Sequence, residues 1–233
     1  MHPLLRTLTG VRFLGWHRRI TESSYWSAAI PCGLTGTATV TVTGTSGSLN
    51  HSTTIALTVS SGTQTAVYYS TLGAPECASV GTSCDSGPSL LVGRDNMSGG
   101  AEPNQPNTIN NSCADGTVGS FHSDESNDRI VVTSSSGALT QGRTATVTAT
   151  VWAFSATDDA LDLYYAANAN SPSWVFIKTI KPTKTGAQNL SASFKLPTGS
   201  LQAVRAQFRY GGSASPCTTG VYNDHDDLIF AVQ

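Results

Sequence analysis

The sequence predicts an all-β protein, most simply an antiparallel β-sandwich of the jelly-roll type. Thr, Ser, Gly and Ala are abundant and Lys and Glu are few, which favours strands and turns because β-branched residues fit a pleated surface and Gly supplies turn geometry. From residue 129 onward, short alternating runs follow one another with no helical period between them. Turn signals containing Gly, Pro or Ser separate these runs, as in sandwiches and jelly rolls.

The overall charge limits the partners. The 233 residues carry a formal net charge of −2 and only 12% charged residues. This balance argues against nucleic acid or an anionic membrane surface as a partner. No run of 18 apolar residues is present, so the sequence predicts no membrane span.

The first 35 residues differ from the rest in composition and periodicity. Arg6, Arg12, Arg18 and Arg19 interrupt the apolar residues, so no 7–15-residue apolar core of a signal peptide forms. We expect residues 1–35 to be a non-native or truncated start that is poorly ordered.

Residues 36–62 predict a β-hairpin. Two alternating runs, 37–44 and 52–59, flank a turn of Gly, Ser and Asn at 45–50. Two strands alone are marginal in water, so the hairpin needs a partner. It resembles the final two strands of immunoglobulin-like modules that occur in tandem in secreted bacterial proteins.

Residues 63–233 form the predicted sandwich domain. A short strand at 65–70 is followed by loops up to about residue 121, a length that is uncommon unless the segment is stapled or functional. Seven further strands are predicted at 129–134, 144–154, 161–166, 174–180, 189–196, 201–210 and 228–232. The predicted inner face includes Val147, Val151, Leu161, Leu163, Phe194, Val204, Phe208 and Ile229.

Five cysteines lie in this loop-rich background, and none forms a CxxC pair. Disulfides of an exported protein therefore explain them better than a zinc site. Cys77 and Cys84 are near enough in sequence to close a short loop. Pairing Cys113 with Cys217 would join two acidic regions and would leave Cys32 over, although the sequence alone does not decide the connectivity.

Two acidic windows, residues 122–128 and 222–227, run into predicted strands. With Asp115 they hold seven of the fifteen acidic residues, and Arg129 is the nearest basic residue in sequence to either window. Clustered carboxylates repel one another unless a cation or basic groups neutralise them, and hard oxygen ligands suit Ca²⁺. We therefore predict a calcium site, with two solvated acidic turns as the alternative. Its predicted ligands are Asp124, Glu125, Asp128, Asp224, Asp226 and Asp227.

Several motifs carry a family resemblance. They are Glu102-Pro103-Asn104, the 124–128 window, Leu161 to Tyr165, Ser171 to Trp174, Leu201 to Arg205 and Tyr222 to Val232. From about residue 76, the chain resembles the C-terminal accessory domains of secreted proteases and other exoenzymes of myxobacteria and related soil bacteria. The ending Asp226 to Phe230 is similar to galactose-binding-like jelly rolls, including carbohydrate-binding modules. In those, an aspartate on the last strand often ligates a structural calcium.

Candidate ligand-binding residues lie on the later strands. The run 201–210 places Arg205, Gln207 and Arg209 on one face, where they could hydrogen-bond sugar hydroxyls or a carboxylate. Alternatively, both arginines neutralise nearby acids. Aromatic residues could form a stacking platform or simply belong to the core. The predicted binding residues are Trp174, Tyr165, Arg205 and Arg209.

Hydrolysis is the main alternative function. The segment 84–88 resembles the nucleophile region of trypsin-like proteases but lacks two of its glycines and an upstream His-Cys segment. His122 and His225 lie beside carboxylates that suit acid–base work, and paired carboxylates could serve a glycosidase. The hydrolase hypothesis uses Asp124, Glu125, His122, Asp226 or His225.

The interpretation that best fits these features is a secreted, disulfide-linked, calcium-stabilised sandwich without catalytic activity of its own. It would be an accessory domain of a larger exoenzyme and would bind an extracellular polymer, either carbohydrate or protein. A third possibility is a purely structural cell-surface module. The distinguishing observation is whether the acidic windows form a closed ion cage or line an open cleft.

Overall fold

The computed structural model describes residues 36–46, 48–59, 62–94, 99 and 102–233. The predictions for residues 1–35 and for Cys32 lie outside these residues. The chain divides into two compact units, Met1–Ser60 and Ser61–Gln233. Within the described residues the regular structure is strands and one short 3₁₀ turn, so the all-β prediction is confirmed.

The described part of the first unit is a β-hairpin. Strand β1 (Gly36–Ser46) pairs antiparallel with β2 (Leu49–Val59) in continuous register, from Gly36 opposite Val59 to Ser46 opposite Leu49. The two predicted runs lie inside these strands. Thr alternates along β1, and β-branched residues of this kind favour extended backbone.

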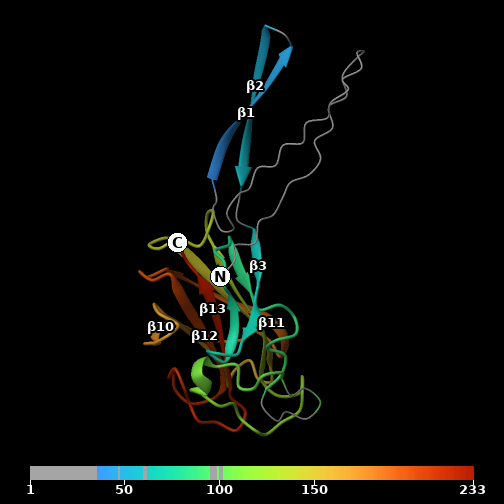
Figure 1. Cartoon of the computed structure of the whole chain (residues 1–233). Coiled ribbons are helices and arrows are strands. Elements are labelled where there is room, and N and C mark those ends of the chain that lie inside the picture. Colours follow the sequence, from blue (N-terminus) through green and yellow to red (C-terminus); the bar gives the residue numbers. More distant parts are fainter. Residues whose placement is uncertain (1–35, 47, 60–61, 95–98, 100–101) are drawn as a thin grey trace. The chain divides into compact units, whose positions relative to one another are not determined.

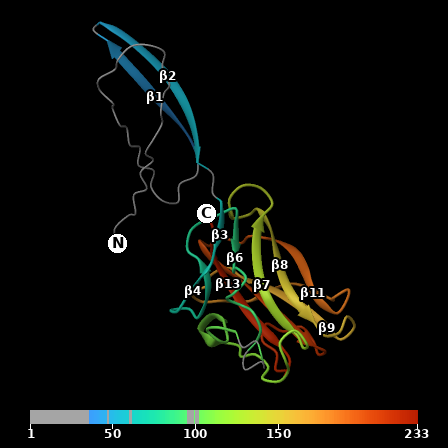
Figure 2. The ribbon, with the colours of Figure 1, turned by 90° about the vertical axis from the view of Figure 1, so that its right-hand side faces the viewer.

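The second unit is a sandwich of two sheets (Figures 1 and 2). One sheet has six strands in the order β10-β9-β12-β13-β5-β4, and the other has five in the order β11-β8-β7-β6-β3. The strands before residue 90 are short: β3 (Thr63–Thr65), β4 (Val67–Tyr69), β5 (Ala74–Cys77) and β6 (Ser83–Asp85). The later ones are β7 (Ser126–Ser134), β8 (Thr144–Ala153), β9 (Asp159–Ala166), β10 (Val175–Ile180), β11 (Gly186–Lys195), β12 (Leu201–Tyr210) and β13 (Asp224–Ala231). A 3₁₀ turn, η1, spans Ile109–Asn111.

Alternation along each strand decides which face is buried. In β8, Val147, Ala149 and Val151 are buried in the core. The alternating threonines Thr146, Thr148 and Thr150 point outward, and their hydroxyls bond to Ser193, Ser191 and Asn189 of β11. Period-two patterning thus accounts for the buried inner face of this sheet.

The structure corrects three features of the predicted topology. Strands β5 and β6 lie in the stretch expected to be loops. Both take part in parallel pairs, β13 with β5 and β3 with β6, so the sheets are mixed rather than purely antiparallel. Strands β7 and β13 also begin earlier than predicted, at Ser126 and Asp224, so the ends of both acidic windows are strand residues rather than turns.

The main core lies between the two sheets. Seven of the eight predicted inner residues belong to it, namely Val147, Val151, Leu161, Leu163, Phe194, Val204 and Phe208. The prediction that Ile229 faces the main core was wrong. It is fully buried, but in a second cluster with Leu72, Ala74, Ile109, Ala169 and Ala203. Its neighbours Leu228 and Phe230 take the inward positions, because successive residues of a strand face opposite sides.

Both predicted disulfides are confirmed. Cys77–Cys84 joins β5 of the six-stranded sheet to β6 of the five-stranded sheet, within the main core. Cys113–Cys217 joins the loop after η1 to the loop between β12 and β13, over a sequence separation of 104. In the described part of the chain, no helix is long and apolar enough to cross a membrane.

Candidate metal centre

The first half of β13 places four polar side chains inside the protein. Asp224 and Asp226 share a face with Leu228 and Phe230 and therefore point between the sheets. His225 and Asp227 point to the opposite face. All four are 0% exposed. One strand thus carries buried carboxylates on both sides.

A loop rather than a strand covers the edge of this half of β13. Strand β5 pairs with β13 only at Ile229 and Phe230. Further toward the start of β13, the Asp227 N–H donates to the Asn107 carbonyl at 3.1 Å. The His225 N–H donates to Asp115 Oδ1 at 2.7 Å. The 102–118 loop therefore satisfies edge groups that would otherwise be buried without partners.

The inward carboxylates are incompletely bonded. Asp224 Oδ2 accepts the Asn127 N–H of β7 at 2.6 Å, which links the two sheets. Asp224 Oδ1 and both carboxylate oxygens of Asp226 are buried without a hydrogen-bond partner in the described part of the chain. A buried carboxylate is costly unless it is protonated, paired with a cation or bound to a metal.

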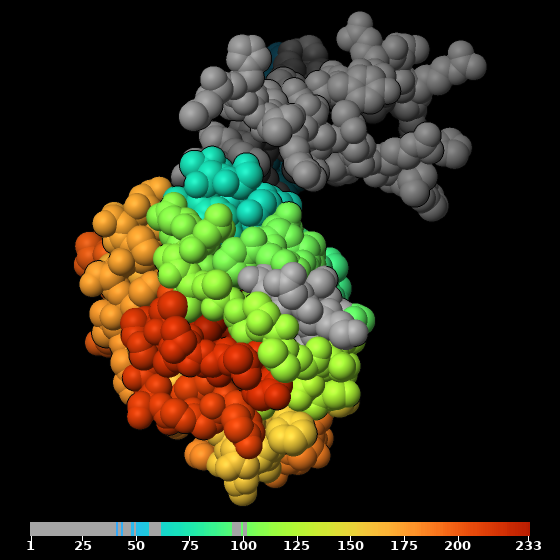
Figure 3. Space-filling model, turned by 90° about the horizontal axis from the view of Figure 1, so that it is seen from below, coloured from blue at the N-terminus to red at the C-terminus, as the bar shows by residue number. Residues whose placement is uncertain are grey.

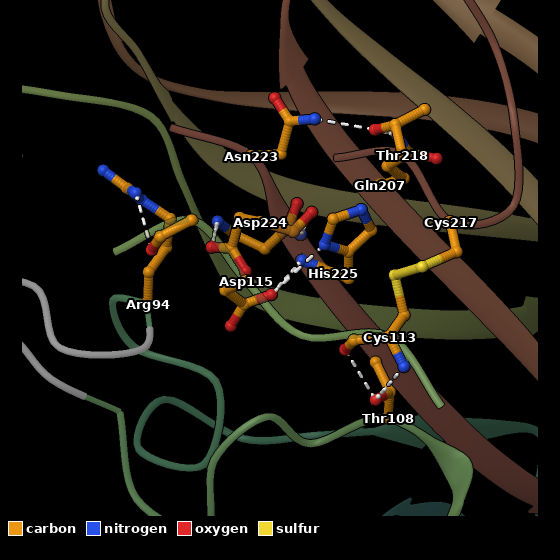
Figure 4. A network of polar contacts seen from close by, with 12 residues as sticks. Arg94, Thr108, Cys113, Asp115, Gln207, Cys217, Thr218, Asn223, Asp224 and His225 are labelled. Carbon is orange, nitrogen blue, oxygen red and sulfur yellow. Dashed lines mark hydrogen bonds and ion pairs between the residues drawn. A yellow bond between two sulfur atoms is a disulfide. The ribbon is translucent and has the colours of Figure 1, made fainter. Parts of the chain in front are cut away.

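Other carboxylates lie close to this pair. Burial raises the pKa of Asp226 well above its ordinary value, and Glu102, Asp224, Asp115 and Asp227 raise it further. Burial, Asp115 and Glu102 likewise raise the pKa of Asp224, whereas the Asn127 N–H and Arg94 oppose the shift. Figure 4 shows Asp115 and Asp224 close together near the start of β13. The acidic neighbours of β13 therefore come from the 102–118 loop.

Asp227 has a different environment from the other two aspartates of β13. Arg205 Nε donates to its Oδ1 at 2.7 Å, and Arg205 Nη2 donates to its Oδ2 at 2.8 Å. The Ile109 N–H also donates to Oδ2, at 2.7 Å. Asp227, predicted as a calcium ligand, therefore has both oxygens occupied by protein donors. The basic partners of this region are not the nearest in sequence, since Arg205 pairs with Asp227 and Arg94 acts on Asp224.

The predicted row of exposed polar residues on β12 is buried. Arg205 is 2% and Arg209 7% exposed. Arg209 Nε donates to Asp162 Oδ2 at 2.6 Å, and Gln207 donates to Thr218 (Figure 4). The alternative interpretation, that both arginines neutralise acids, describes this face correctly.

The two predicted aromatic binding residues are also engaged within the domain. The Arg205 guanidinium lies 4.4 Å from the Trp174 ring centroid, and Trp174 is half-buried against the second cluster. Tyr165 stacks on Phe194 at 5.4 Å and packs against the main core. Trp174, Tyr165, Arg205 and Arg209 therefore do not form an exposed platform.

The first acidic window distributes its carboxylates among separate partners. Asp124 accepts the Ser120 N–H at 2.8 Å. Asp128 contacts His122 Nε2 at 3.0 Å and accepts from Ser126 Oγ at 2.9 Å. Glu125 faces Asp159, and burial together with this neighbour raises the Glu125 pKa to about 8. The carboxylates that raise the Asp226 pKa are instead Glu102, Asp224, Asp115 and Asp227.

The groups of the hydrolase hypothesis are likewise dispersed. His225 and Asp226 lie on opposite faces of β13, and both are fully buried. In the protease-like segment, Ser86 is 1% exposed, and its Oγ accepts the Ile130 N–H at 3.0 Å and donates to the Gly87 carbonyl. Asp85 pairs with Arg129. This segment is the end of β6 and the residues directly after it, and these contacts hold it against β7.

Glu102 and Asp115 were left out of the predicted ligands, although Asp115 was grouped with the acidic windows. Both were visible, Glu102 in the Glu-Pro-Asn motif and Asp115 two residues after Cys113. The confirmed Cys113–Cys217 pairing was the available signal, since it fixes Asp115 near the start of the last strand. Arg94, which acts on Asp224, and Asp159 at the start of β9, which acts on Glu125, carried no such signal, because both are far from these partners in sequence.

This arrangement can hold a hard divalent cation. Carboxylate oxygens are the ligands that Ca²⁺ prefers, and its irregular coordination suits groups drawn from a loop and a strand. Across the described residues, no three Asp, Glu, His or Cys side chains are already positioned as a metal shell. The case for a cation therefore rests on the burial of Asp226 and Asp224 and on their unbonded oxygens. No protein-family model matches the chain, and no curated protein matches its sequence.

Proposed function

We propose that residues 61–233 form a non-catalytic, calcium-stabilised module that binds an extracellular polymer for an attached exoenzyme. The observation that carries this proposal is Asp226, which is fully buried with both carboxylate oxygens unbonded. A calcium ion would neutralise Asp226 and Asp224 and would draw the Glu102 carboxylate into the same shell. The Asn107 amide oxygen, also buried and unbonded, is a neutral candidate ligand.

A cation explains this site better than protonation alone. Several carboxylates act on Asp226, and each raises the cost of ionising the others. Protonating one would leave the remaining charges close to one another, whereas a divalent ion neutralises two at once. Arg94 offsets part of the charge at Asp224, whereas both Asp226 oxygens are buried without a hydrogen-bond partner among the described residues. We therefore assign Glu102, Asp224 and Asp226 as the ligands.

Two further features support an exported binding module. Both disulfides link parts of the sandwich, and such bonds persist in oxidising compartments. The groups of the hydrolase hypothesis do not gather at one open site, since His122 pairs with Asp128, Asp124 accepts the Ser120 N–H, and His225 and Asp226 are buried on opposite faces of β13. This dispersal favours a non-catalytic module. Hydrolysis of a peptide, ester or glycoside that disappears in both His122→Ala and His225→Ala would overturn the non-catalytic assignment.

Thermal unfolding with and without calcium tests the metal site. An ion that binds only the folded state stabilises it by about 2.7 kcal/mol at a hundredfold excess over Kd. Chelator should therefore lower the melting temperature of the wild type. Asp226→Asn should abolish this response, while Asp124→Asn, which changes a carboxylate outside the site, should preserve it. A wild-type melting temperature that is equal in calcium and in chelator would refute the proposal.

A further inference from the structure

Three aromatic rings meet at the surface at one end of the sandwich. Phe154 follows the end of β8 and is 52% exposed, and Tyr210 ends β12 and is 46% exposed. Their ring centroids lie 6.2 Å apart at an interplanar angle of 62°. Tyr222, in the β12–β13 loop, lies 6.1 Å from Tyr210 at 75°. We call Phe154, Tyr210 and Tyr222, with the neighbouring Val221 (54% exposed), the aromatic end patch.

The core does not account for this patch. None of its residues belongs to either buried cluster. The rings come from segments far apart in the sequence, and Tyr210 contacts both of the others. Phe154 and Tyr210 are exposed, and Tyr222 is half-buried beside them. Figure 3 views the end of the sandwich where the β8–β9 turn (gold) and the β12–β13 loop (red) come together at the surface. Contiguous exposed apolar surface of this kind marks interaction sites.

The backbone beneath the patch is fixed by hydrogen bonds. The Tyr210 N–H donates to Asn223 Oδ1 at 3.2 Å, and Asn223 Nδ2 donates to Thr218 Oγ1 at 2.6 Å (Figure 4). The loop that carries Asp115 pairs with the same segment, through Gly116 N–H to the Asn223 carbonyl at 2.7 Å. A side chain at Gly116 would collide with the Val221 carbonyl, 2.2 Å from the Cβ position. The rings therefore sit on a preorganised support, which lowers the entropic cost of binding.

The surroundings of the patch carry little available charge. Residues 211–223, which include the whole β12–β13 loop, contain no charged residue. Asp158, the carboxylate nearest in sequence to Phe154, is exposed and accepts hydrogen bonds from Ser155 and Thr157. Lys181 offsets its charge, since the Lys181 Nζ donates to the Thr157 carbonyl and its positive charge, together with these hydrogen bonds, helps to lower the Asp158 pKa. Arg209 is occupied by Asp162 and by the carbonyls of Gly211 and Gly212. The available groups are ring faces, tyrosine hydroxyls and serines, which suit a ligand with apolar ring faces and hydroxyl edges.

From this chemistry we infer that the aromatic end patch binds a neutral polysaccharide, with sugar rings packed on Phe154 and Tyr210. The inference rests on the proposed function of the domain as a polymer-binding module, and it replaces the platform predicted around Trp174. It also connects the two sites, because the 102–118 loop that would ligate calcium supports the segment that carries Tyr222. The neutral surroundings favour a sugar polymer over a polyanion or an anionic membrane.

Polysaccharide binding by the full chain tests the inference in saturating calcium. The neutral probes are cellulose, chitin and starch, and the anionic probes are polygalacturonate and dextran sulfate. We expect at least one neutral probe to bind. Phe154→Ala and Tyr210→Ala should each weaken this binding tenfold or more, with little change in melting temperature.

Phe176→Ala is the matched control. Phe176 is 51% exposed and makes an edge-to-face contact with Tyr164 at 5.5 Å, but it lies on β10. Its binding should equal that of the wild type. Neutral binding that survives both Phe154→Ala and Tyr210→Ala would overturn the patch and leave the proposed function standing.

The remaining outcomes concern other partners. Binding to no probe, or to the anionic probes alone, would overturn the neutral-polysaccharide assignment, whereas the calcium response is measured separately. Self-association in sedimentation analysis that is lost in Phe154→Ala would assign the patch to a second copy of the chain and would also overturn the inference.

Discussion

At the scale of residues, Asp226 and Asp227 show how one position in a strand changes the chemistry of a carboxylate. Asp227 faces outward and receives both Arg205 nitrogens and the Ile109 N–H. Asp226 faces inward, where its oxygens have no donor among the described residues and other carboxylates are its electrostatic neighbours. The first is a buried ion pair, and the second needs a proton or a metal ion.

The ion pair predicts a specific pattern of stability. Arg205→Met would leave Asp227 buried with one backbone donor, and we expect a loss of about 3–5 kcal/mol in the free energy of unfolding. Arg205→Met combined with Asp227→Leu should recover most of this loss, because it removes both charges. Denaturant unfolding with calcium in excess measures each value. If the free energy of unfolding of Arg205→Met lies within about 0.5 kcal/mol of the wild-type value, the Arg205–Asp227 pair does not stabilise the fold.

The contact between Glu125 and Asp159 predicts a pH dependence. The Glu125 pKa is about 8 in the folded protein against an ordinary value of 4.5, so the folded state holds a proton that the unfolded state has released. Its contribution to stability is therefore complete below pH 4.5 and is lost as the pH rises to about 8, by at most about 1.4 kcal/mol per pH unit.

The variant Glu125→Gln isolates this effect, because its amide can still donate to Asp159 but does not titrate. With calcium kept in excess, the stability of the wild type relative to Glu125→Gln should fall between pH 5 and pH 8. If the free energy of unfolding of the wild type relative to Glu125→Gln stays constant or rises over this range, Glu125 does not hold a proton in the folded state as predicted.

At the scale of elements, alternating patterns predicted most of the later strands, and β12 has the predicted bounds of 201–210. The same patterns failed for β5 and β6, which are four and three residues long and cannot show a period. They also left Asp224 to Asp227 outside the last predicted strand, 228–232, because four consecutive polar residues interrupt the alternating pattern. These residues can form a strand because the 102–118 loop bonds to the edge of β13 and because Asn127 of the second sheet bonds to Asp224.

The neighbours of the buried β13 carboxylates were predicted only in part, because they come from segments far away in the sequence. Carboxylate clustering identified β13, but the ligands predicted from the 122–128 window lie with other partners. Sequence proximity grouped Asp124, Glu125 and Asp128, whereas the β-bulge between Asn127 and Arg129 and the turn before β7 separate their side chains. Glu102 and Asp115 reach β13 through a long loop whose path no local pattern specifies.

The long-range disulfide gives a prediction about this loop. Replacing Cys113 and Cys217 with serine should cost about 4–5 kcal/mol on the loop-entropy model, because the bond closes 104 residues. It should also weaken calcium binding, since Cys113 anchors the loop that carries Asp115. Replacing Cys77 and Cys84 with alanine should cost only about 2–3 kcal/mol on the same model. Equal calcium affinity in the wild type and the Cys113/Cys217 variant would show that the anchoring of this loop has no role in calcium binding.

At the scale of the molecule, a hydrogen bond between the sheets, the 102–118 loop and the long-range disulfide all lie near the start of β13. The two sheets meet there through Asp224 and Asn127, the 102–118 loop closes the strand edge, and the Cys113–Cys217 bond joins this loop to the β12–β13 loop. The aromatic end patch is built on the same β12–β13 loop. A metal ion at Asp226 would therefore stabilise the sandwich and the proposed binding surface together.

Metal content measured directly on the intact chain tests this account most closely. After equilibration with calcium and removal of free ions, native mass spectrometry of the wild type should show one calcium ion per chain. Asp226→Asn should show none, while Asp124→Asn should keep the ion. A wild-type chain without bound calcium, or an Asp226→Asn chain that retains it, would contradict the assignment of Asp226 as the central ligand.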